Sequence, residues 1–164
     1  MDRLHKNINF QCLSIYKKPH ISLTRRPEVT FIQEPGIDAG ALTREYFSIG
    51  MMALTKEPLN TGDGSYPLFE GKPDHKLPTP NPFLQQCGMY VAVGKFIAHS
   101  ILHGGPGLAG VSEVLKEYLI TGEMEELTPV SDDIPDPDLC ALVKEVLYNA
   151  AYDMTHNCQN DVYK

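Results

Sequence analysis

The chain has 164 residues, of which 42% are hydrophobic and 21% are charged, and its formal net charge at pH 7 is −7. This composition is typical of one folded globular domain and argues against a disordered tail. The acidic excess argues against a nucleic acid or an anionic membrane as the main partner. Two local basic pairs, Lys17-Lys18 and Arg25-Arg26, are interpreted as solvated loops rather than binding sites.

The N-terminal sequence does not have the layout of a secretory signal. The longest apolar run, from Met89 to Leu102, contains Lys95 and His99 and is too short to cross a bilayer. We therefore expect a cytoplasmic or nuclear protein. The four cysteines are scattered along the chain: Cys12, Cys87, Cys140 and Cys158. Because none belongs to a C-x-x-C pair, we expect reduced thiols rather than disulfides or a zinc site.

The first elements are predicted to be two short strands. Residues Phe10 to Tyr16 alternate partly between apolar and polar, and Val29 to Gln33 is a β-branched and aromatic run. A helix follows, because apolar residues then recur at spacings of four, three and four: Leu42, Tyr46, Ile49 and Ala53. Asp38 is expected to cap this helix, and Pro58 to end it.

The stretch from Asn60 to Pro82 contains five prolines and is predicted to be a long irregular connection. Four large apolar residues are expected to anchor it to the core: Tyr66, Leu68, Phe69 and Leu77. The next helix is predicted from Pro82 to His103. One apolar stripe runs along it: Leu84, Cys87, Val91, Gly94, Ala98 and Ile101. Its small residues, Gly94 and Ala98, would let another helix approach closely, and the glycines from Gly104 onward end it.

A third stripe predicts another helix that ends at Gly122: Val111, Val114, Leu115, Tyr118 and Leu119. After an acidic link from Glu123 to Pro135, Asp136-Pro137 is predicted to begin the last helix. One face of that helix is apolar: Leu139, Leu142, Val143, Val146, Leu147 and Ala150. The tail from Thr155 to Lys164 is polar and aperiodic. These elements predict an α+β fold that is mainly α, with a few short strands near the N-terminus.

The histidines and cysteines offer two weak catalytic or metal-binding patterns. His99 and His103 are four residues apart on one predicted helix, a spacing that can present two imidazoles to a metal ion. No third ligand is evident, so surface or helix-end histidines are favoured. His156 and Cys158 lie in the polar tail, where a thiol hydrolase would lack a rigid scaffold and an orienting group.

The remaining polar clusters are also better explained without chemistry. Asn60 to Ser65 lacks the spacing of a calcium loop and is interpreted as a turn, and Gly36 to Gly40 lacks the ending of a phosphate loop and is interpreted as a strand-to-helix turn. The pairs Glu125-Glu126 and Asp132-Asp133 are interpreted as solvated loop charge. We therefore predict no catalytic residue, no metal ligand and no cofactor from the residues alone.

The segment from Val29 to Phe47 resembles the signature near the start of the N-lobe of HECT-type ubiquitin ligases. The matching residues are Glu34, Gly36, Asp38, Gly40, Arg44, Glu45, Tyr46 and Phe47. Three later steps keep the family's order: a Pro-Leu-Phe69 element, Asn81-Pro82, and the run from Val93 to Ala98, which includes Gly94. Asp136 to Leu139 opens the last helix in the same register. The resemblance covers roughly Val29 to Asn149, with Lys95 replacing the usual arginine, and Ala41 and the Gly104 to Gly110 stretch departing from the pattern.

This resemblance implies the larger, mainly helical subdomain of a HECT N-lobe. The implied organisation is an N-terminal strand or arm (1–28), a partial N-lobe (29–154) and a polar tail (155–164). The implied partners are ubiquitin or a ubiquitin-charged conjugating enzyme, and possibly a HECT C-lobe. Some family members carry a noncovalent ubiquitin patch, which matches Tyr66, Leu68 and Leu77 only loosely, so packing is the favoured role for these three residues.

Transfer in this family uses a cysteine of the C-lobe, and none of the four cysteines lies in a context like its threonine-cysteine-x-asparagine segment. The resemblance therefore implies part of a ubiquitin ligase that is inactive alone, without that cysteine and without the subdomain that docks the conjugating enzyme. The alternative is a noncatalytic interaction or regulatory module of the ubiquitin pathway. A small thiol hydrolase is the third hypothesis.

Overall fold

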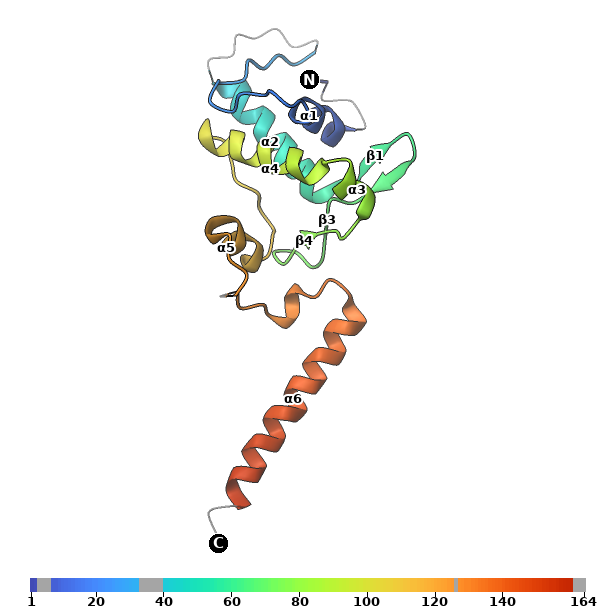
Figure 1. The fold of residues 1–164 in the computed structure, drawn as a ribbon, viewed down its shortest axis with the longest axis vertical. Helices are drawn as coiled ribbons and strands as arrows, with labels where there is room; N and C mark the ends of the chain where they lie inside the picture. The colour runs from blue at the N-terminus through green and yellow to red at the C-terminus, as the bar shows by residue number, and fades with distance from the viewer. Residues whose placement is uncertain (3–6, 33–39, 126, 161–164) are drawn as a thin grey trace. The chain divides into compact units, whose positions relative to one another are not determined.

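The computed structural model describes residues 1–2, 7–32, 40–125 and 127–160, with side chains up to residue 152 (Figure 1). Its described part contains six α-helices, one 3-10 helix and two small two-stranded sheets, which confirms the predicted mainly helical α+β class. The chain divides into two compact units. Unit 1 comprises Met1–Glu70 and Pro78–Gly110, and unit 2 comprises Gly71–Leu77 and Val111–Lys164.

Four helices lie in unit 1: α1 (Ile8–Tyr16), α2 (Ala41–Lys56), α3 (Pro82–Gln86) and α4 (Met89–Leu102). Helices α1, α2 and α4 pack on one another (Figure 1). Their facing side chains form an apolar core that includes Cys12, Leu13, Tyr16, Phe47, Leu54 and Phe96. Burial of this kind stabilises a domain by roughly 25 cal/mol for each Å² of apolar surface removed from water.

The predicted strand from Phe10 to Tyr16 is wrong, because these residues belong to helix α1. The side chain of Asn7 caps this helix by accepting a hydrogen bond from the Phe10 amide at 3.3 Å. The buried residues recur at helical spacing rather than alternately: Asn9, Cys12, Leu13 and Tyr16. Val29 to Ile32 forms no strand either, and Gln33 lies outside the described residues.

The strands of the described part instead fall within the stretch predicted to be irregular. Strands β1 (Leu59–Thr61) and β2 (Gly64–Tyr66) pair antiparallel, with Leu59 opposite Tyr66 and Thr61 opposite Gly64. The two residues between them make the hairpin turn, so the turn interpretation of this polar cluster is confirmed. Strands β3 (Phe69–Glu70) and β4 (Leu77–Pro78) form the second sheet.

Helix α2 has the predicted extent but not the predicted face. It ends at Lys56, two residues before Pro58. Of the predicted stripe only Ala53 is buried. The other buried residues of the helix are Thr43, Phe47, Gly50, Met51 and Leu54. Asp38, the predicted cap, lies outside the described residues. Gly40 is the N-cap and has a φ of 102°, a conformation that favours glycine.

The long helix predicted from Pro82 to His103 is two helices. Gly88, with a φ of 69°, separates α3 from α4. The predicted stripe on α4 is wrong, since Val91 and Ile101 are 62% and 59% exposed. The buried face is formed instead by Met89, Ala92, Val93, Phe96, His99 and Ser100.

Unit 2 contains α5 (Glu113–Thr121), the 3-10 helix η1 (Ser131–Asp133) and α6 (Pro137–Asn160). Helix α5 begins after Ser112, whose side chain accepts from the Val114 amide at 3.1 Å, and ends at Gly122 as predicted. A parallel bridge joins Val111 to Lys76, and the Ser112 amide donates to the Lys76 carbonyl at 3.0 Å. None of the side chains of α5 is buried.

The predicted start of helix α6 is confirmed. Asp136 Oδ1 accepts from the amides of Asp138 and Leu139 at 2.9 and 3.0 Å, and Pro137 is the first helical residue. The predicted apolar face is present but uncovered, with Leu142 and Val146 56% and 59% exposed. The helix continues to Asn160, past the predicted start of the tail at Thr155. No helix in the described part of the chain has the length and apolar character needed to cross a membrane.

Candidate functional site

The motif residues that open α2 serve the start of the helix and the core. A Cβ at Gly40 would overlap the guanidinium of Arg26, so a larger residue would displace that side chain. Arg44 is exposed, Glu45 and Tyr46 are partly buried, and Phe47 is fully buried. Glu34, Gly36 and Asp38 lie outside the described residues. Gly94 is exposed on α4, and a Cβ there would meet nothing within 4 Å, so no helix of the described part approaches it.

The two motif aromatics pack into a cluster of rings around Phe96. The Phe96 centroid lies 5.4 Å from that of Tyr16, 5.7 Å from Tyr46 and 5.5 Å from Phe47. Two of these contacts, those with Tyr16 and Tyr46, are edge-to-face, the arrangement that the ring quadrupoles favour. The aromatic pair of the motif is therefore part of the hydrophobic core of unit 1.

His99 closes this cluster on its polar side. Its ring is 3% exposed, and Nε2 lies 2.9 Å from the Arg25 carbonyl oxygen while Nδ1 lies 2.8 Å from the Tyr16 hydroxyl. Because a carbonyl only accepts, Nε2 carries the proton and Nδ1 accepts from Tyr16. Burial lowers the pKa of His99, and the carbonyl of Arg25 opposes that shift, so the ring is neutral near pH 7.

The predicted surface position of His99 is therefore wrong, whereas His103 does cap the end of α4. His103 Nε2 donates to the Leu23 carbonyl at 2.9 Å, so the two histidines fasten one loop onto the helix. Each uses Nε2 for that purpose. In the described part of the chain no group of three or more potential ligands is placed to hold a metal ion.

A cavity of about 520 Å³ lies beside this cluster in unit 1. Its volume falls within the range of small-molecule pockets. The lining includes Tyr16, Tyr46 and His99, together with the exposed Arg25 and Arg26 that the sequence analysis placed in a solvated loop. On this wall the Tyr16 hydroxyl and the His99 ring are bonded to each other, and His99 is also bonded to the Arg25 carbonyl.

The three described thiols differ in their surroundings. Cys12 is fully buried, and burial raises its pKa to about 12, so it stays a thiol at neutral pH. Cys87 is partly exposed at the end of α3 and donates to the Leu84 carbonyl. Cys140 is 3% exposed and belongs to the polar network of unit 2. The side chains of Cys158 and His156 lie outside the described residues.

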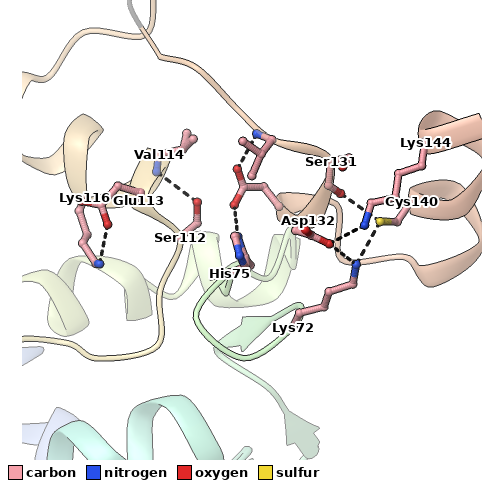
Figure 2. A network of polar contacts seen from close by, with 12 residues as sticks. Lys72, His75, Ser112, Glu113, Val114, Lys116, Ser131, Asp132, Cys140 and Lys144 are labelled. Carbon is pink, nitrogen blue, oxygen red and sulfur yellow. Dashed lines mark hydrogen bonds and ion pairs between the residues drawn. The ribbon is translucent and has the colours of Figure 1, made fainter. Parts of the chain in front are cut away.

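Polar contacts hold the loop Gly71–Leu77, η1 and the start of α6 together in unit 2 (Figure 2). Asp132 Oδ1 accepts from Lys72 at 2.7 Å and from Lys144 at 2.8 Å. The hydrogen bonds from Lys144 and Lys72 hold the pKa of Asp132 far below its usual value. Asp132 thus carries a negative charge at any ordinary pH.

Asp133 makes a second set of contacts in the same network. It is buried, and its carboxylate accepts from His75 Nδ1 and from the Val130 amide, both at 2.9 Å. Burial alone would raise the pKa of Asp133, but hydrogen bonds from Ser112, Val130 and His75 outweigh burial and lower it. The prediction of solvated loop charge is therefore wrong for Asp133, whereas the side chain of Asp132 is 43% exposed and pairs with two lysines.

The residues of the predicted ubiquitin patch have unequal exposure. Leu68 is 1% exposed and offers no surface to a partner. Tyr66 is partly buried, and its ring lies 5.2 Å from that of Phe83. Leu77 is partly buried in β4. Packing accounts for Leu68, whereas ubiquitin binding through Tyr66 and Leu77 stays a prediction.

Comparison with known proteins gives one consistent result. No protein-family model and no solved structure matches the chain. The G2/M phase-specific E3 ubiquitin-protein ligase of Gallus gallus is 30% identical over 96 residues, that of Macaca fascicularis 26% over 140, and that of Homo sapiens 33% over 76. These matches cover 58%, 84% and 46% of this chain, but only 13%, 18% and 10% of the ligases. The chain is thus distantly and partially similar to a ubiquitin ligase and spans less than a fifth of its length.

Proposed function

We propose that this chain works in ubiquitin transfer as a noncatalytic part of a HECT-type ligase, equivalent to the larger subdomain of its N-lobe. The main support for this proposal is the sequence similarity to the ubiquitin ligases of three species. The segment that resembles the HECT signature supports the assignment to the N-lobe. Its Gly40 occupies the start of α2, and its Tyr46 and Phe47 pack in the aromatic cluster.

The thiol environments support a noncatalytic role. A transferase cysteine must present a thiolate to a thioester carried by another protein. Cys12 is buried and protonated, and Cys140 is buried with its sulfur in contact with Lys72 and the Ser131 carbonyl. In our proposal the acceptor cysteine belongs to a C-lobe and the conjugating enzyme docks on a further subdomain.

The first experiment incubates the chain with activating enzyme, a panel of conjugating enzymes, ATP and tagged ubiquitin, followed by a nonreducing gel. We expect no thiol-sensitive ubiquitin adduct on this chain, while a complete HECT ligase in the same panel forms one. An adduct abolished by substituting any single one of the four cysteines by serine would show that the chain is itself a transferase and would overturn the proposal.

The second experiment tests for a positive role. Titration of the chain into ¹⁵N-labelled ubiquitin, free and linked to a conjugating enzyme, should shift ubiquitin resonances. Tyr66→Ala and Leu77→Asp should weaken those shifts, and Gly94→Ala is the matched surface control. Shifts that neither variant changes would place ubiquitin elsewhere on the chain.

A second candidate function is a regulatory module that binds a ligase C-lobe. Such a module needs an exposed apolar patch, and the described residues between Asn60 and Pro82 include no exposed large apolar side chain. The exposed apolar face lies on α6 instead, and such faces mark interaction sites. Loss of C-lobe binding in Leu142→Asp, with binding retained in Glu145→Ala, would favour this candidate over the first.

A further inference from the structure

Three segments of unit 2 meet at the sulfur of Cys140 (Figure 2). Lys72 Nζ, from the loop Gly71–Leu77, lies 3.1 Å from Cys140 Sγ at the start of α6. The thiol donates to the Ser131 carbonyl at 3.1 Å, and Asp132 holds the ammonium of Lys72 at 2.7 Å. Both reacting atoms are therefore fixed in direct contact by separate partners.

This contact distinguishes Cys140 from the other described thiols. A separation of 3.1 Å is within the range of about 3–3.5 Å from which bonds form without a large rearrangement. Cys12 lies among apolar and tyrosine side chains, and the hydrogen bond of Cys87 goes to a backbone carbonyl. Among the described cysteines, the hydrogen bonds of the structure place an amine nitrogen against Cys140 alone.

We infer that Lys72 and Cys140 form an oxidative cross-linking site whose co-reactant is a hydroperoxide. In the first step the Cys140 sulfur attacks hydrogen peroxide, the O–O bond breaks, and a sulfenic acid and one water form. In the second step the Lys72 amine attacks that sulfur, the S–O bond breaks, and a second water leaves as the S–N bond forms. The protein loses two hydrogens, and an external thiol can reverse the link by reduction.

The surroundings determine when the link forms. The side chain of Lys72 is 38% exposed, so its movement gives a molecule as small as peroxide access to the buried sulfur. The amine must first lose its proton, and the hydrogen bond to Asp132 raises the pKa of Lys72. The charged or titratable groups that face Lys72 are Asp132 from η1 and Cys140 from α6. Lys144 forms a second ion pair with the same oxygen of Asp132. The second step should therefore accelerate as the pH rises.

The link would join two segments of unit 2 that are 68 residues apart in the sequence. The loop Gly71–Leu77 and helix α6 would then be held covalently as well as by ion pairs. Because thiols reverse the bond, the ambient redox state would decide whether the start of α6 can separate from the loop.

The test treats the full chain with hydrogen peroxide at neutral and mildly alkaline pH, then measures its mass and maps its peptides by tandem mass spectrometry. A protease that does not cleave at lysine keeps the detection independent of Lys72. We expect a peptide pair joined through Lys72 and Cys140, lighter by two hydrogens, more abundant at the higher pH and removed by dithiothreitol. Sequencing of the pair distinguishes it from a disulfide of equal mass.

Three variants provide matched controls. Lys72→Arg keeps the cation and its contact with Asp132 but has no condensing amine, so the linked peptide should disappear and dimedone should trap more sulfenic acid on Cys140. Cys140→Ser should abolish both signals, whereas Lys144→Arg should leave the link intact. The inference would be overturned if Cys140 of the unsubstituted chain became oxidised while Lys72 always stayed unmodified. A link between the two residues that retains an oxygen atom would overturn the proposed second step, in which the amine displaces that oxygen as water.

Discussion

Replacing Gly50 by alanine should destabilise unit 1, although alanine is the better helix former. Gly50 lies within α2, and a Cβ there would overlap Phe96 Cζ, lie 3.0 Å from Phe96 Cε1 and lie 3.1 Å from Cys12 Sγ. Phe96 is fully buried and packs against Tyr16 and Phe47, so its ring can shift only by disturbing these neighbours.

The expected magnitude follows from two opposing contributions. Alanine in a helix interior is favoured over glycine by about 1 kcal/mol. Overpacking of a filled core costs about 1–3 kcal/mol, and an overlap with a confined ring belongs at the upper end. Gly50→Ala should therefore lower the free energy of unfolding by about 2 kcal/mol. Gly94→Ala, whose Cβ would meet nothing within 4 Å, should raise it by about 1 kcal/mol.

Urea denaturation followed by circular dichroism measures both changes, and unaltered slopes would show that stability alone has changed. In a Phe96→Leu background the smaller side chain leaves room for the new methyl group. Gly50→Ala should then cost less than in the unsubstituted chain, which is a coupling that a double-mutant cycle detects. Equal stabilities of Gly50→Ala and Gly94→Ala would refute the packing argument.

Three further predictions concern polar groups. Because the pKa of buried His99 is lower than its unfolded value of about 6.5, the unfolded state binds more protons, so stability should fall as the pH drops below that value. Urea midpoints at about pH 7.5 and 5.5 should show this slope, and His99→Gln should reduce it. Asp136→Ala removes the cap of α6 and should lower the stability of that helix by about 1 kcal/mol. Hydrogen exchange of the α6 amides measures this change, and Glu145→Ala should have little effect on it. Asp133→Asn should cost about 1–3 kcal/mol, because the buried contact with His75 loses its charge; a midpoint equal to that of the unsubstituted chain would contradict this.

Several element boundaries could be predicted from the sequence because the responsible chemistry is local. Asp136 caps α6 with its own side chain, Gly122 ends α5 in a left-handed conformation, and α2 ends before Pro58. Each signal lies within a few residues of the boundary that it determines. In the segment from Phe10 to Tyr16, the partial alternation of apolar and polar residues fits a strand as well as a helix. The local signal that favours a helix is Asn7, whose side chain caps it.

The buried faces were harder to predict because periodicity fixes the spacing of a stripe but not the side of the helix that meets a partner. On α4, Val91 and Val93 are equally apolar, yet the first is exposed and the second is buried. The ring of Phe96 meets α1 and α2, so its position selects the buried side. The same interaction places Phe47 of α2 at the centre of the core and Tyr46 at its edge.

The candidate sites depend on contacts between residues far apart in the sequence. Tyr16 and His99 are 83 residues apart, and Lys72 and Asp132 are 60 apart. Neither pair has a spacing signal, so His99 resembled a surface residue, and the sequence did not indicate the lysine partners of Asp132. One usable signal was present: His99 lies on the same helical face as Phe96, which indicates a buried position.

The two units differ in what holds them together, and this difference explains which predictions failed. Unit 1 is organised by an aromatic core, so its errors concern which side of a helix faces inward. The described part of unit 2 buries few side chains, and Asp133 and Cys140 are two of them. Polar contacts with Lys72 and His75 therefore carry much of its cohesion. A unit held in this way should be more sensitive to salt and oxidation than one held by apolar packing, because these conditions act on charges and thiols.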